Sequence, residues 1–511
     1  MSYLKIENEN NCMLEKNHSL TTKFIKIILA LWIILLLSYR ISICFSYLPE
    51  LSNGESNNIW KAINVAHGKP MYNDPEQLPL EVFQYTPISQ FPIVAIAKIL
   101  DKNGPNYVYL VTALGRLYEL IANIFLVILI YYISKKWFDT TNITRLLISL
   151  VSFTLLTNPA FTIRPDATLL LFLMITIWSY LNMEESNKFS WIILTASLIT
   201  ICFFTKQDGI LIAGPLAIRL VFLKKWKKLV VLSTIAIGIL FTSLIISPLV
   251  FGPNFYTCVF KGLKNTSSLK QIIVVFDRAY GFYAFHFVFG IISSMYFIIK
   301  HPKEKIALFS ILSIFYLFVA IATSSKSGSW VNYYTPYIIF STILIFTFIS
   351  KLFYSSLKIN PIFSFFIAVS FSMFFLFKQV YVYTSPFLTH SNGKNHYYKE
   401  FNEIIKLKSK LKISKNDFIL TANQLDRNFL ANNSIMVNTE YYSYASYKYE
   451  SFKKQKNKKI DYIIYKTKDK PSIDYLLQFF QVSTVQYDTI KINKFTVLVN
   501  QLNKKNNSIS N

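Results

Sequence analysis

The chain has 511 residues, of which 53% are hydrophobic, 17% aromatic and 16% charged. A soluble protein carries about 25% charged residues, so this composition argues against a soluble globular protein. The formal net charge of +26 would suit nucleic-acid binding, but many basic residues lie in short loops between apolar runs, where they set membrane orientation. We therefore expect an integral membrane protein with no nucleic-acid partner.

Eleven apolar runs approach the length of about 20 residues that crosses a bilayer. They cover residues 24–45, 107–133, 143–160, 166–183, 189–204, 209–223, 229–251, 279–299, 305–323, 332–350 and 361–384. The twenty residues before the first run are polar and contain acids, and no small-residue cleavage site follows it, which favours a retained span over a signal peptide. The expected fold is a polytopic α-helical membrane protein of about eleven transmembrane helices.

The short basic loops all fall on one side of this topology. They contain Lys135-Lys136, Lys188, the 224–228 cluster, Lys300 to Lys305, and Lys351 with Lys358. The positive-inside rule then predicts a cytoplasmic N-terminus, and an odd number of spans predicts an extracytoplasmic C-terminal segment. We expect a transmembrane domain over residues 1–385 and an extracytoplasmic domain over residues 386–511, in the cell (inner) membrane.

The two largest extracytoplasmic parts show different patterns. The first loop, residues 46–106, contains two weakly amphipathic stretches, 56–67 and 88–100, which indicate helices lying on the membrane surface. The C-terminal segment combines a helical pattern near 398–412 with short runs of β type, so we expect a small α/β domain there.

Ionisable residues near membrane level gather on the predicted outer side. They are Glu50, Glu55, Arg164, Asp166, Lys206, Asp208, Arg278 and Lys326. A charge at the bilayer centre costs about 2.5–3.5 kcal/mol on insertion scales, and the cost falls toward the interface. Their positions at the ends of different apolar runs predict a shared polar cavity that opens outward.

Three of these residues each have a functional and an ordinary interpretation. A carboxylate at Glu55 suits a general base, or an acid in the first turn of a helix, where the dipole favours it. The guanidinium of Arg164 suits a phosphate, or an anchor at the interface. Lys206 offers a second cation for a phosphate, or a side chain that snorkels to the interface.

Other chemistries find little support in the sequence. No GxGxxG or GxxxxGK[ST] motif marks a nucleotide site, and the histidines and cysteines show no metal-binding spacing. We expect no cofactor, and a divalent metal is not indicated. Arg116 and Glu119 lie three residues apart in an expected span and can pair on one helix face.

The first loop contains Glu55, a short helical pattern, a turn over Gly68–Tyr72 and the step Tyr85-Thr86-Pro87. Four further motifs follow in order: Gly115-Arg116-Leu117, Arg164-Pro165-Asp166, Thr205-Lys206-Gln207 and Gly328 to Tyr334. This ordered set resembles the polyprenyl-phosphate-sugar-dependent glycosyltransferases of the GT-C fold, in particular the bacterial protein mannosyltransferase and aminoarabinose transferase groups.

The resemblance implies transfer of a sugar from a polyprenyl-phosphate donor to an extracytoplasmic lipid, glycan or protein acceptor, with inversion at the anomeric centre. It gives Glu55 the role of general base, although many members have aspartate at this position and this chain has glutamate. Glu50, five residues earlier, is a competing candidate. Arg164 and Lys206 take the donor phosphate. The supporting residues that it suggests are Asp166, Gln207, Tyr85, Asn332 and Tyr333.

Two other functions use similar membrane architectures. A transporter or lipid-linked-glycan flippase would carry polar residues through the whole membrane depth, whereas the charged candidates here gather at one side. A glycan polymerase or ligase would also use lipid-linked donors. The expected function remains a membrane glycosyltransferase.

Overall fold

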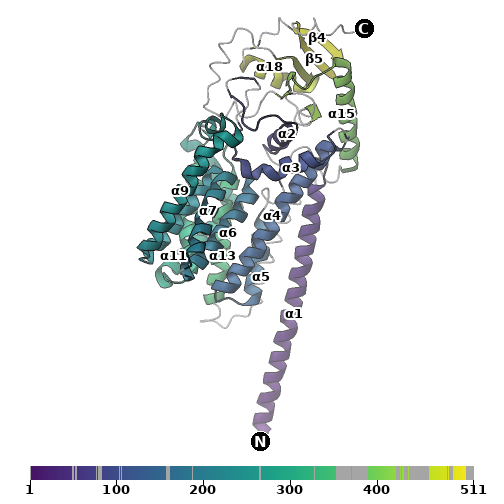
Figure 1. The fold of residues 1–511 in the computed structure, drawn as a ribbon. Coiled ribbons are helices and arrows are strands. Elements are labelled where there is room, and N and C mark those ends of the chain that lie inside the picture. Colours follow the sequence, from purple (N-terminus) through teal and green to yellow (C-terminus); the bar gives the residue numbers. More distant parts are fainter. Residues whose placement is uncertain are drawn as a thin grey trace.

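The computed structural model shows a bundle of long helices with a small sheet-containing domain at one end (Figure 1). It describes the chain apart from residues 1, 49–50, 52–53, 76, 79–82, 103, 105, 157–161, 187, 264–265, 327, 353–369, 371–373, 375–389, 422–425, 427–428, 431–434, 437–459, 480–481, 483–486 and 502–511. The expected span 361–384 and the base candidate Glu50 therefore lie outside the described residues.

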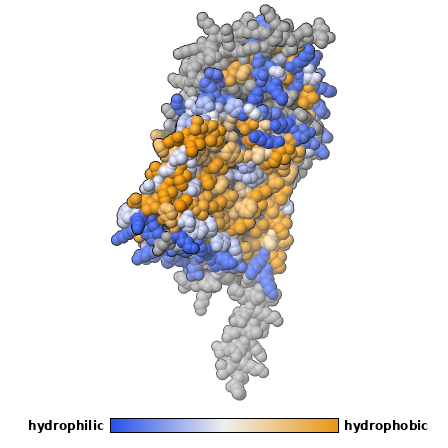
Figure 2. All heavy atoms as spheres, in the orientation of Figure 1, coloured by the Kyte–Doolittle hydropathy of each residue, from blue (hydrophilic) through white to orange (hydrophobic). Residues whose placement is uncertain are grey.

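Seven helical stretches in the described part of the chain are long and apolar enough to cross a membrane. They are Lys23–Cys44 of α1 (Ser2–Cys44), α4 (Tyr107–Trp137), α6 (Pro165–Glu185), α9 (Trp226–Phe251), α11 (Leu269–Lys300), α12 (Ile306–Thr323), and Val331–Leu352, which joins η5 (Val331–Tyr334) to α13 (Thr335–Leu352). Figure 2 shows their apolar side chains as a belt between two hydrophilic ends. This confirms a multi-pass helical membrane protein.

Three further apolar runs form shorter helices, α5 (Asn142–Leu155), α7 (Phe189–Thr205) and α8 (Ala213–Phe222). At 1.5 Å per residue, the 14 residues of α5 extend about 21 Å, less than the hydrocarbon core of about 30 Å. α5 packs against α4, and α7 packs against α6. Among the described residues, fewer helices than the predicted eleven are long and apolar enough to cross a membrane. Several of the apolar runs instead form short helices inside the bundle.

A tight turn joins α7 to the segment that follows it. α7 ends at Thr205, and the chain continues through the 3₁₀ helix η3 (Gln207–Ile212) into α8. The turn needs a glycine, because a Cβ on Gly209 would lie 2.3 Å from the carbonyl oxygen of Cys202 in the last turn of α7. The backbone of this turn therefore packs directly on α7 and fixes the residues on either side of Gly209.

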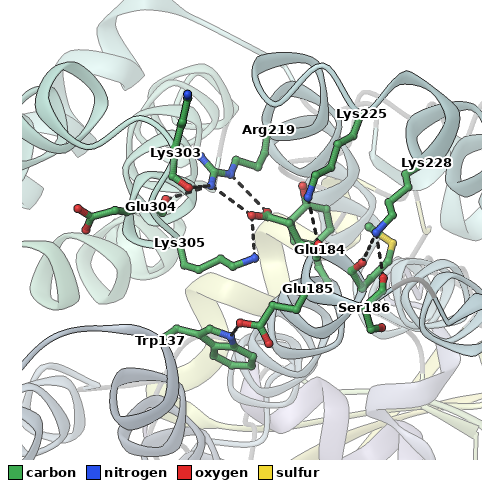
Figure 3. Close-up of polar contacts among 12 residues, drawn as sticks. Trp137, Glu184, Glu185, Ser186, Arg219, Lys225, Lys228, Lys303, Glu304 and Lys305 are labelled. Carbon is green, nitrogen blue, oxygen red and sulfur yellow. Dashed lines mark hydrogen bonds and ion pairs between the residues drawn. The ribbon is translucent and has the colours of Figure 1, made fainter.

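The basic loops meet at one end of the bundle, which we call the basic end (Figure 3). Glu184 in the last turn of α6 pairs with Arg219 of α8 and with Lys305, at 3.3 and 2.8 Å. Lys225 and Lys228 donate to the last carbonyl groups of α6, where cations are favoured by the helix dipole. The grouping predicted from the sequence is thus present at one end of the bundle.

The first loop and two short helices cover the opposite end. The loop contains α2 (Glu55–Ala66), η1 (Pro87–Ser89) and α3 (Phe91–Ile99), and the chain after α9 adds α10 (Phe255–Val259) and η4 (Lys261–Leu263). Nearly every residue of α2 is buried, and α2 packs against α3. The two helices predicted in this loop are present, but the predicted position on the membrane surface is wrong for α2, which is buried inside the protein.

The C-terminal domain is a mixed α/β unit. α15 (His390–Leu411) and α18 (Lys470–Phe479) accompany a five-stranded sheet of order β2-β1-β3-β5-β4. The strands are β1 (Phe418–Leu420), β2 (Ile435–Met436), β3 (Tyr462–Lys466), β4 (Tyr487–Ile492) and β5 (Phe495–Asn500). β1 pairs in parallel with β2 and β3, and β5 pairs antiparallel with β3 and β4. The predicted small α/β domain is confirmed.

Aromatic side chains join this domain to the bundle. Tyr47, just after α1, stacks on Tyr109 of α4 with ring centroids 4.2 Å apart. Tyr397 of α15 contacts both rings, and its neighbour Tyr398 donates a hydrogen bond to Asn106. The C-terminal domain therefore rests on the end of the bundle opposite the basic end.

Candidate functional site

A cluster of charged residues lies at the bundle end covered by the first loop, centred on Asp166. Lys206 Nζ lies 3.0 Å from Asp166 Oδ1, and Arg164 Nε lies 3.3 Å from Asp166 Oδ2. Asn332 Nδ2 donates to Asp166 Oδ1 at 3.1 Å. We call Arg164, Asp166, Lys206, Asp208 and Asn332 the Asp166 cluster. It brings together three chain segments that are far apart in the sequence.

Lys206 is held by two carboxylates and an aromatic ring. Its Nζ lies 3.2 Å from Asp208 Oδ2 as well as 3.0 Å from Asp166, and it stands 4.9 Å from the centre of the Tyr333 ring. Burial alone would lower the pKa of Lys206, but the two carboxylates outweigh it and raise that pKa above its usual value. Lys206 is therefore a fixed cation.

Helix ends place these side chains. Pro165 occupies the first turn of α6, which suits its fixed φ, so Arg164 precedes the helix and Asp166 lies in its first turn. Lys206 follows the last residue of α7. Asn332 and Tyr333 belong to η5, at the start of α13.

Two other predicted supporting residues lie beside the cluster. Gln207 does not contact Asp166 in any described hydrogen bond; its Nε2 donates to the carbonyl groups of Gln84 and Val259, which ties the turn to the first loop and to α10. The carbonyl of Tyr85, in the first loop, accepts a hydrogen bond from Tyr72 of the same loop. Gln207 therefore joins the turn after α7 to the first loop, whereas Tyr85 makes its described hydrogen bond within that loop.

Glu55 lies in the first turn of α2 and is fully buried against Arg116 of α4. Arg116 Nε and Nη2 each donate to one carboxylate oxygen at 2.9 Å, and both side chains are 0% exposed. The amide N–H of Leu51 donates to Oε2 at 2.7 Å, and that of Ile163 donates to Oε1 at 3.1 Å. Each oxygen thus accepts two hydrogen bonds, which fills the lone-pair sites of a carboxylate.

The contacts of α2 also fix the backbone next to the Asp166 cluster. The N–H of Ile163 bonds to Glu55, and the carbonyl of Ile163 accepts from Asn58 at 2.8 Å. Ile163 directly precedes Arg164. Glu55 therefore helps to fix the backbone at Arg164 through its hydrogen bond to Ile163.

Arg116 and Glu119 do not form the pair that their spacing allows. Arg116 bonds to Glu55, and Glu119 instead accepts a hydrogen bond from Thr168 of α6 at 3.1 Å. The sequence gives no signal for the Arg116–Glu55 pair, because its partners are 61 positions apart. Among the described residues, no group of three potential metal-ligating side chains is present.

The segment that carries most of these residues is similar to a known protein family. The family model described as dolichyl-phosphate-mannose-protein mannosyltransferase matches residues 110–251, a range that contains Arg116, Arg164, Asp166, Lys206 and Asp208. No curated protein sequence matches the chain.

Two solved structures of ArnT from Cupriavidus metallidurans have a similar fold. The structure bound to undecaprenyl phosphate aligns with a TM-score of 0.55 and 11% identity, over 94% of this chain and 99% of that chain. The apo structure aligns with a TM-score of 0.53 and 11% identity, over 91% and 97%. The architecture of this chain, including its C-terminal domain, is thus the GT-C fold.

The family match and this fold define the class of protein. The chain is a multi-pass membrane protein with the fold of ArnT, and its residues 110–251 are similar to the dolichyl-phosphate-mannose-protein mannosyltransferase family. Its resemblance is to the protein mannosyltransferase and ArnT group, as the sequence motifs indicate.

Proposed function

We propose that the protein transfers a sugar from a polyprenyl-phosphate donor to an extracytoplasmic acceptor, and that the Asp166 cluster binds the donor phosphate. The observation that carries this proposal is the convergence of Arg164 and Lys206 on one carboxylate at a single end of the bundle. Charge-assisted hydrogen bonds from such cations are the usual means of holding a phosphate. Asp166 holds the side chains of Arg164 and Lys206 close to each other.

The position of the cluster suits a donor that resides in the bilayer. It lies at the ends of α6 and α7, at the margin of the apolar belt, under the first loop and on the same end as the C-terminal domain. A lipid-linked phosphate enters the protein at this level without crossing the membrane. With the basic end in the cytoplasm, the transfer takes place outside.

The reaction needs few protein groups. A hydroxyl or amine of the acceptor attacks the anomeric carbon, the bond from that carbon to the phosphate oxygen breaks, and its electron pair stays on the polyprenyl phosphate. The acceptor proton passes to a carboxylate, and attack opposite the phosphate inverts the anomeric centre. Arg164 and Lys206 stabilise the charge that develops on the leaving phosphate.

The general base remains a prediction. Glu55 serves as the base only if its carboxylate leaves Arg116 in the reacting complex, because both oxygens are occupied in the present arrangement. The same carboxylate in its present position orders the backbone that carries Arg164.

Donor consumption by the purified protein tests the proposal. We expect one member of a panel of undecaprenyl-phosphate sugars to be consumed, and Lys206→Ala to weaken donor binding about ten- to hundredfold, the value of one charge-assisted contact of about 1.5–3 kcal/mol. Lys228→Ala is the matched control, since Lys228 also lies at a helix end but bonds to carbonyl groups at the basic end. Failure to consume any donor, or equal effects of both variants, would contradict the proposal.

A further inference from the structure

We propose that Asp208 makes the site discriminate between its donor and its lipid product, by repelling the more highly charged product phosphate. The inference rests on the proposed function and assigns a residue that the sequence motifs leave without a role. The donor is a phosphodiester with one negative charge. The polyprenyl phosphate that remains after transfer is a monoester, which approaches two negative charges above its second pKa of about 6.

Asp208 shares its cation with the proposed phosphate site. Its Oδ2 lies 3.2 Å from Lys206 Nζ, on the same ammonium group that Asp166 contacts at 3.0 Å. A phosphate bound to Lys206 therefore lies within a few ångströms of a carboxylate that carries the same sign of charge. Asp208 therefore repels any anion that binds at Lys206.

Local stability does not account for an acid at this position. Asp208 Oδ1 is buried and has no hydrogen-bond partner among the described residues, an arrangement that destabilises the folded state. Without Asp208, Lys206 would still be paired with the carboxylate of Asp166. Asp166 Oδ2 likewise has no hydrogen-bond partner among the described residues, but Asp166 forms ion pairs with both Lys206 and Arg164 and accepts a hydrogen bond from Asn332.

The exposure of the two acids also differs. The Asp208 side chain is 25% exposed, whereas that of Asp166 is 7% exposed. Asp208 Oδ1 is buried, and Oδ2 is the oxygen that lies 3.2 Å from Lys206 Nζ. Asp208 is thus placed to act on the bound anion, and Asp166 to act on the cations.

The sign and the charge dependence of the effect follow from Coulomb's law. At an effective dielectric constant of about 20, two unit charges about 5–10 Å apart interact strongly enough to change a binding constant by about ten- to several hundredfold. The repulsion energy is proportional to the ligand charge, so a doubly charged monoester experiences about twice the repulsion energy of a singly charged diester. Asp208 therefore favours the release of product over the release of donor.

Binding of two undecaprenyl probes tests the proposal directly. One is undecaprenyl phosphate, and the other is its methyl ester, a phosphodiester that lacks the sugar and cannot react. At pH 8, we expect Asp208→Asn to bind the methyl ester at least about tenfold more tightly than the wild-type protein, and to bind undecaprenyl phosphate at least about a hundredfold more tightly, because twice the repulsion energy squares the factor. In turnover with a consumed donor, KM and kcat of Asp208→Asn should fall together, because product leaves slowly.

The controls separate the possible failures. Asp277→Asn removes an exposed acid of α11 and should change neither affinity, whereas Lys206→Ala should weaken both. Tighter binding does not arise from misfolding, and Asp208→Ser provides a second variant if the asparagine form is unstable. Equal tightening for both probes, or unchanged or weaker binding in both Asp208 variants, would overturn the role of Asp208 alone. If the wild-type protein binds neither probe, the proposed phosphate site fails, and this inference fails with it.

Discussion

Glu55 and Arg116 form a bidentate ion pair that joins the first loop to α4, and both side chains are 0% exposed. The pair also receives the Ile163 amide, so it connects α2, α4 and the start of α6 at one point. Breaking one partner of a buried pair costs about 3–5 kcal/mol, because the other charge is left unpaired. Its removal should therefore affect the structure of the site as well as its chemistry.

We expect Glu55→Gln to lower the melting temperature, to weaken undecaprenyl phosphate binding and to reduce turnover together, since Arg164 loses its ordered backbone. Arg116→Gln should show the same three effects. If Glu55→Gln instead keeps stability and lipid binding but loses about 10²–10⁴ in turnover, Glu55 is the general base. Glu50→Gln, measured in parallel, examines the competing candidate.

Gly209 provides a test of the turn that carries Lys206 and Asp208. An added Cβ would lie 2.3 Å from the Cys202 carbonyl oxygen, so Gly209→Ala should displace the turn and cost about 1–3 kcal/mol, with weaker lipid phosphate binding. Gly238→Ala is the control, because a Cβ on this α9 glycine meets no atom within 4 Å. Wild-type binding by Gly209→Ala would show that Lys206 does not depend on this turn.

Neighbouring glutamates at the basic end differ in their environment. Glu184 is 3% exposed and pairs with Arg219 and Lys305 (Figure 3). Glu185 is 42% exposed and pairs with Lys136 at 3.8 Å. Glu184→Gln should lower the free energy of unfolding by about 3 kcal/mol or more, and Glu185→Gln by at most about 1 kcal/mol. Thermal or denaturant unfolding in detergent measures both, and similar losses would contradict a structural role for the Glu184 network.

Orientation in the membrane is testable with matched lysine positions. In a chain without native cysteines, Lys399→Cys on α15 should react with a membrane-impermeant thiol reagent in intact cells. Lys303→Cys, in the turn between α11 and α12, should react only after the cells are permeabilised. Both lysines are exposed, so accessibility in the folded protein does not decide the result. The reverse pattern would place the Asp166 cluster on the cytoplasmic side.

The sequence was sufficient for the parts of the site that lie at helix ends. Arg164, Asp166 and Lys206 each adjoin an apolar run, and the positions of such ends can be read from hydropathy alone. Their convergence in the structure agrees with the ordered motifs, although their role in binding stays a prediction. Asn332 joins them through a hydrogen bond that the sequence pattern does not specify.

Other features depended on tertiary packing that no local pattern records. Arg116 has an acid three residues away, yet it pairs with Glu55 because α2 is buried inside the protein rather than lying on the surface. Asp208 has its place in the site only because Gly209 lets the chain reverse closely on α7. The hydropathy pattern also predicted α5 and α8 as spans. Hydropathy measures composition, and it does not show that a short helix is covered by its neighbours.

The two ends of α6 have a consequence for the membrane itself. Asp166 and Glu184 are 18 residues apart on this helix, which is five turns, so they share one face and are separated by about 27 Å along the axis. Each is fixed to other helices by cations, and this distance approximates the thickness of a bilayer core of about 30 Å. The protein therefore has little freedom to stretch or shorten with its host membrane. In vesicles of phospholipids with increasing acyl-chain length, activity should pass through a maximum at the matching thickness and fall on both sides of it.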